Sequence, residues 1–81
     1  MARARSATVQ RRRRALGARI RALRHAQGWS QEVLADRASL HRTYVSSVEL
    51  GERNISMDNL YAVADALHVQ VRELFDSEHS R

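Results

Sequence analysis

The 81-residue sequence contains no cysteine, no proline and no lysine, and these absences exclude several classes of protein. Without cysteine there is no disulfide scaffold, no thiolate zinc site and no thiol catalysis. The lack of proline, together with closely spaced apolar residues, favours an all-helical fold. No apolar run approaches the roughly 18 residues of a membrane span, so we expect a cytoplasmic protein with no membrane partner.

Catalytic and cofactor-binding motifs are also missing. The three glycines form no phosphate-binding loop, and no paired carboxylates converge on an evident pocket. The four histidines lack metal-ligand spacing; they are His25, His41, His68 and His79. We therefore expect no enzyme activity, no metal and no cofactor.

Charge is divided unevenly along the chain. Residues 1–30 contain nine Arg and no acidic residue, whereas residues 31–81 contain five Arg and all nine acids, which gives +9 and −4. This asymmetry indicates a polyanionic partner, nucleic acid before a membrane surface. Arg binds phosphate through a planar fork that Lys lacks. The exclusive use of Arg is equally well explained by a genome rich in arginine codons.

The chain is long enough for a single domain. Residues 1–8 have small and basic side chains without periodicity, and we expect a disordered basic arm there. Residues 9–76 are expected to form the folded domain, and residues 77–81 a frayed polar tail. From about Val9 a helical stripe begins, which consists of Leu16, Ile20 and Leu23.

Capping residues predict where the helices begin and end. Ser30 and Ser56 are good N-caps, and Gly28 and Gly51 are suited to the left-handed conformation that follows a helix. The helices predicted after the first one span about residues 31–38, 42–50, 57–67 and 71–75.

The segment from Gln31 to Leu50 has the pattern of two crossing helices. Its apolar residues fall on the buried sides of a short helix, a turn and a second helix, and Ala35 is small enough for the close crossing of a helix-turn-helix. The second helix then presents its polar residues outward.

At this point the sequence resembles the Xre or Cro/C1-type helix-turn-helix regulators, which include phage repressors. The matching pieces are I-R-x-L-R (Ile20 to Arg24), S-Q-E-x-L-A from Ser30, and ADALHV from Ala64. The resemblance implies a compact five-helix lambda-repressor-like DNA-binding domain with the helix-turn-helix at helices 2 and 3. A narrower stretch, RTYVSSVELGERN from Arg42, is similar to controller proteins of restriction-modification systems.

Three residues depart from the family pattern. Ser39 and His68 stand where the family has glycine, so each would take an unfavourable left-handed conformation. His41 replaces the usual Asp or Ser cap, which predicts a weaker start to the recognition helix.

Double-stranded DNA is the expected partner, with the helix from Arg42 in the major groove. The expected base-reading residues are Arg42, Thr43, Tyr44, Ser46 and Ser47. The expected backbone contacts are Gln31, Arg53, Asn54, Arg11, Arg12, Arg13 and Arg14. For each of these residues a solvated surface position or an ordinary capping role is the alternative.

The resemblance also implies a structural ion pair between Arg24 and Glu49. The number of apolar residues near the C-terminus exceeds what docking of a short helix requires, so we expect a homodimer interface there, although core packing alone would also explain them. The expected interface residues are Val69, Val71, Leu74 and Phe75.

The sequence is therefore interpreted as a homodimeric transcriptional regulator of an inverted-repeat operator, possessing no activity as an enzyme. Activation would additionally require contact with RNA polymerase. One alternative is an antitoxin that neutralises a toxin and binds DNA secondarily, and another is general polyanion or RNA binding by the arginine-rich end.

Overall fold

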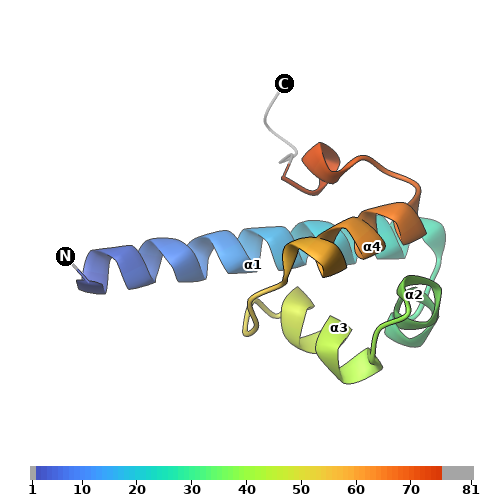
Figure 1. The fold of residues 1–81 in the computed structure, drawn as a ribbon, viewed down its shortest axis with the longest axis horizontal. Coiled ribbons are helices and arrows are strands. Elements are labelled where there is room, and N and C mark those ends of the chain that lie inside the picture. Colours follow the sequence, from blue (N-terminus) through green and yellow to red (C-terminus); the bar gives the residue numbers. More distant parts are fainter. Residues whose placement is uncertain (1, 76–81) are drawn as a thin grey trace.

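The structure is a computed structural model that describes residues 2–75, with side chains described from residue 5 onward. Its elements are α1 (Ala2–Gln27), α2 (Gln31–Ala38), α3 (Arg42–Glu49), α4 (Met57–Leu67) and η1 (Val71–Phe75), shown in Figure 1. Residues 2–75 contain helices and no strand, so the expected all-helical fold is confirmed. The expected count of five α-helices is wrong, because residues 71–75 form a short 3₁₀ segment and only four α-helices are described.

Helix α1 begins at Ala2, not near Val9. Residues 2–8 are therefore helical in this structure, and the expectation of a disordered arm over residues 1–8 is wrong for them. Ala and Arg are strong helix formers, so intrinsic propensity extends the helix where hydrophobic periodicity gives no signal. With 26 residues, α1 is about 39 Å long at ~1.5 Å per residue. Its N-terminal half extends beyond the other elements (Figure 1).

The predicted helix caps are present. The Ser30 hydroxyl accepts a hydrogen bond from the Val33 amide at 3.1 Å, and the Ser56 hydroxyl accepts one from the Asn59 amide at 3.1 Å. His41 makes no side-chain cap, which matches the weaker start expected for α3. Each such bond satisfies an amide that the helix itself leaves without a partner.

Left-handed backbone follows α2 and α4 at residues that are not glycine. Ser39 has φ 58° and His68 has φ 61°. Each costs on the order of 1 kcal/mol relative to glycine. The turn of the helix-turn-helix therefore keeps the left-handed geometry in spite of the unfavourable residue.

The core lies where α1, α2, α3 and α4 meet, and η1 closes one side of it. Arg19 of α1 donates a 2.8 Å hydrogen bond from Nε to the Glu73 carbonyl, which holds η1 against α1. The side chains with the least exposure come from four elements: Ile20, Leu34, Leu67 and Leu74.

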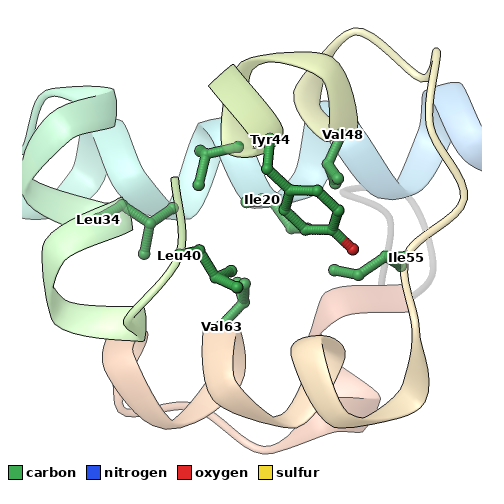
Figure 2. A pocket seen from close by; sticks show the side chains of 8 residues that line it. Ile20, Leu34, Leu40, Tyr44, Val48, Ile55 and Val63 are labelled. Atoms are coloured by element: carbon green, nitrogen blue, oxygen red, sulfur yellow. The ribbon is translucent and has the colours of Figure 1, made fainter. Parts of the chain in front are cut away.

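A small apolar gap remains inside this core, between α1, α2, α3 and α4 (Figure 2). Its volume is about 10 Å³, which is at the lower limit for one water molecule. The gap is therefore a packing defect and not a binding site for a small molecule. It is lined by Ile20, Leu34, Leu40, Tyr44, Val45, Val48, Ile55 and Val63.

The C-terminal end of α3 lies directly against α1. A Cβ added at Gly17 would come within 2.3 Å of the Val48 carbonyl oxygen and 2.5 Å of the Glu49 carbonyl oxygen. One added at Gly51 would come within 2.8 Å of the Arg14 Cα. Two glycines thus allow the two backbones to touch, and this contact sets the direction of α3 relative to α1.

We predict that Gly17→Ala lowers the free energy of unfolding by about 1–3 kcal/mol, because the added methyl overpacks the contact with α3. Helix propensity alone would change stability the other way, by about 1 kcal/mol in favour of alanine. The measurement is urea denaturation followed by circular dichroism. The exposed Ala22→Gly variant calibrates the propensity term, and a Gly17→Ala protein more stable than the parent would contradict the close contact.

Candidate nucleic-acid interface

Helix α3 presents a polar outer face and an apolar inner face. Val45 and Val48 are buried, whereas Arg42 and Thr43 are exposed at the N-terminal end. Ser46 and Ser47, which lie further along α3, are half-buried. The helix is regular from Arg42 to Glu49, so its first turn forms a rigid and outward-facing set of hydrogen-bonding groups.

Tyr44 does not join this outer set. Its ring is half-buried and lines the core gap beside Ile20, Ile55 and Val63 (Figure 2). The Arg53 guanidinium lies over the ring at 5.2 Å from its centroid, in cation–π geometry. The structure therefore separates Tyr44 from the other expected base-reading residues and uses it to orient Arg53.

The expected ion pair between Arg24 and Glu49 is present and buried. Arg24 donates from Nε to Glu49 Oε2 at 2.7 Å and from Nη2 to Oε1 at 2.9 Å. Its Nη1 also donates to the Trp29 carbonyl at 2.7 Å. The paired geometry satisfies both charged groups in a region where an unpaired charge would be costly.

Gln31 is attached to this ion pair. Its Nε2 donates to Glu49 Oε1 at 3.0 Å, and the residue is half-buried at the first position of α2. The sequence suggested a free phosphate-binding amide at this position. The structure instead holds the amide in one orientation against the carboxylate, at the helix end whose dipole favours an anion.

The arginine run and the loop after α3 lie together. Arg12 and Arg13 of α1 line the same groove as Arg53 and Asn54, although some forty residues separate the two segments. Arg14 is packed at Gly51, and Arg11 donates from Nη2 to the Thr8 hydroxyl at 3.4 Å. The structure thus divides the four consecutive arginines into two that share the groove and two that do not.

The expected dimer residues differ strongly in exposure. Leu74 is fully buried in the core of the monomer, so its assignment to a subunit interface is wrong. Val69 and Val71 are half-buried, and Phe75 is 62% exposed. Sequence reasoning missed Met57 and Tyr61 of α4, which are 67% and 53% exposed. Their i, i+4 spacing puts them on one side of α4, but only the docking of α4 decides that this side faces outward.

Within residues 2–75 no group of three or more His, Cys, Asp or Glu side chains is arranged to hold a metal ion. None of the described helices is long and apolar enough to cross a membrane.

Comparison with known proteins finds helix-turn-helix regulators. Residues 20–74 match the helix-turn-helix family HTH_3. The chain is 44% identical over 61 residues to control protein C.BamHI of Bacillus amyloliquefaciens, which covers 74% of this chain and 75% of that protein.

Solved structures give the same result. The fold is similar to the restriction-modification controller protein C.AhdI from Aeromonas hydrophila, with a TM-score of 0.76, 48% identity, and coverage of 76% of this chain and 94% of that one. It is also similar to the N-terminal DNA binding domain of SinR from Bacillus subtilis, with a TM-score of 0.72, 35% identity, and coverage of 80% and 96%.

We predict that Glu49→Ala lowers the free energy of unfolding by about 3–5 kcal/mol, because it leaves Arg24 buried without its counter-charge. Glu52→Ala removes an exposed carboxylate three residues away and should change stability by about 0.5 kcal/mol or less. Thermal melting of both variants, followed by circular dichroism, tests the comparison. Equal shifts in the two melting temperatures would show that the ion pair does not stabilise the fold.

Proposed function

The chain belongs to the HTH_3 helix-turn-helix family of transcriptional regulators, and from this premise we propose that it binds an inverted-repeat operator as a homodimer. Members of this family bind double-stranded DNA. The similarity to the controller proteins C.BamHI and C.AhdI supports a narrower role, the control of a restriction-modification operon. Operator DNA places this function in the cytoplasm, at the nucleoid.

The outward-facing first turn of α3 carries this proposal. Arg42 and Thr43 are exposed on a rigid helix, and Ser46 and Ser47 are partly accessible one turn later. Arg42 has the planar fork that binds guanine O6 and N7 in the major groove, and Thr43 can contact a thymine methyl. Tyr44 supports the site indirectly through its stacking with Arg53.

Residues around α3 are suited to hold the sugar–phosphate backbone. Gln31 is oriented at the start of α2, and Arg53 and Asn54 are exposed directly after α3. Contacts of this kind set the position and angle of the recognition helix but carry no sequence information. The arginines from Arg11 to Arg14 would add to the same electrostatic attraction.

The second subunit is proposed to cover the exposed apolar residues of α4 and η1. Met57, Tyr61 and Phe75 are more than half exposed, and Val69 and Val71 are half-buried. Large apolar side chains gain free energy when a partner removes them from water. A two-fold dimer would place two α3 helices about 34 Å apart, one turn of DNA.

The relatives named above are named as regulators, which supports transcriptional control over the antitoxin alternative. Activation of a promoter would require a further contact with RNA polymerase, and occupancy of the operator alone would be sufficient for repression.

Selection of bound fragments from a random duplex pool is the direct test of this function, and an inverted repeat is the expected result. On the selected operator, we predict that Arg42→Ala weakens binding by about 1–3 kcal/mol while binding to random duplex is mostly retained. Fluorescence anisotropy measures both affinities. The matched control is Arg72→Ala, which removes an exposed arginine from η1. Equal losses on operator and random duplex would reassign Arg42 to the DNA backbone.

For the dimer, we predict that Phe75→Glu shifts the protein to the monomer in sedimentation at micromolar concentration, because a charge replaces an apolar contact. Leu50→Glu, at a residue 60% exposed beside α3, is the control and should leave the dimer intact. A wild-type protein that sediments only as a monomer would contradict the proposed interface.

A further inference from the structure

The structure contains a groove between α1 and the loop that follows α3, and most of α1's contribution to it lies outside the region that matches the family. The groove has a volume of about 210 Å³. Val9, Arg12, Arg13 and Leu16 of α1 line it, and all four precede residues 20–74. This surface is therefore additional to the helix-turn-helix core.

The groove combines an apolar floor with a cationic rim. The floor consists of Val9, Leu16, Val48 and Ile55, with Phe75 at its edge, and the rim consists of Arg12, Arg13, Arg53 and Asn54. Arg12 and Arg13 form no ion pair with any carboxylate of residues 2–75. Three arginines around an apolar surface therefore offer a site for an anion that also carries an apolar face.

We propose that this groove binds one strand of the DNA sugar–phosphate backbone, next to the half-site that α3 reads. The proposal rests on the DNA-binding function proposed above and assigns a second contact surface to it. Phosphates would pair with the arginine forks of the rim, and the C–H face of the deoxyribose would pack on the floor. Charge complementarity favours this occupant over a second copy of the chain, whose groove carries the same positive charge.

The position of the groove relative to α3 is rigid. Gly17 allows α1 to touch the end of α3, and Gly51 lies against Arg14, so α1 and the loop cannot move apart without losing both contacts. Arg53 is held over the Tyr44 ring at the other side of the groove. A phosphate bound here would therefore sit at a fixed place relative to the bases that α3 contacts.

The same geometry distinguishes arginines that the sequence leaves equivalent. Successive residues of a helix point about 100° apart, so Arg11 points roughly 200° from Arg13. Arg12 and Arg13 line the groove, whereas Arg11 is directed toward Thr8 on the helix surface. Phosphate binding should consequently depend on Arg12 and Arg13 and not on Arg11.

The test measures the salt dependence of binding by the full chain, on the selected operator and on a random duplex of the same length. Arg12→Gln and Arg13→Gln should each flatten the log–log slope by about 0.9 on both duplexes. The affinity ratio of wild type to variant should therefore change about 3.5-fold between 50 and 200 mM salt. Arg11→Gln, the matched control with the same loss of charge, should leave the slope unchanged.

Equal effects of Arg11→Gln and Arg13→Gln would overturn the proposal, because they would indicate diffuse attraction by the whole arginine run. Unchanged slopes together with weaker dimerisation of the Arg12→Gln and Arg13→Gln variants would also overturn it and assign the groove to a subunit contact. Circular dichroism verifies that each variant folds. Operator preference with no slope change rejects the groove alone, whereas slope changes without any preferred sequence reject the proposed specific function alone.

Discussion

The buried ion pair between Arg24 and Glu49 is the interaction on which the arrangement of the helix-turn-helix depends. It connects the end of α1 to the last residue of α3, and the same two side chains also bind the Trp29 carbonyl and the Gln31 amide. Three helices are thus joined around one carboxylate. Because an unpaired charge would be costly at this depth, the carboxylate and guanidinium must stay together, and α3 keeps its place on α1.

A second constraint operates beside this one, through backbone contact instead of charge. Gly17 and Gly51 bring α1 against the C-terminal end of α3, while Val45 and Val48 bury the inner face of α3 in the core. The polar first turn of α3 is consequently held outward without any contact of its own. The proposed DNA-binding surface is in this sense a consequence of packing on the opposite side of the helix.

Local rules predicted much of this arrangement. Ser30 and Ser56 cap the helices that they were expected to cap, because a capping hydrogen bond joins neighbours in sequence. Family resemblance supplied the Arg24–Glu49 pair, which joins residues too far apart for a local rule. The N-terminal helix was missed because periodicity detects burial, whereas residues 2–8 owe their helix to propensity.

The sequence by itself determined the helical class, the helix ends after Gly28, the recognition segment and the strong positive charge of the first thirty residues. Only the tertiary structure decided that Leu74 faces the core, that the Tyr44 ring turns inward beneath Arg53, and that Arg12 and Arg13 meet the loop after α3. The physical reason is that propensities and caps act between near neighbours. The facing of a side chain depends on how helices distant in sequence pack together.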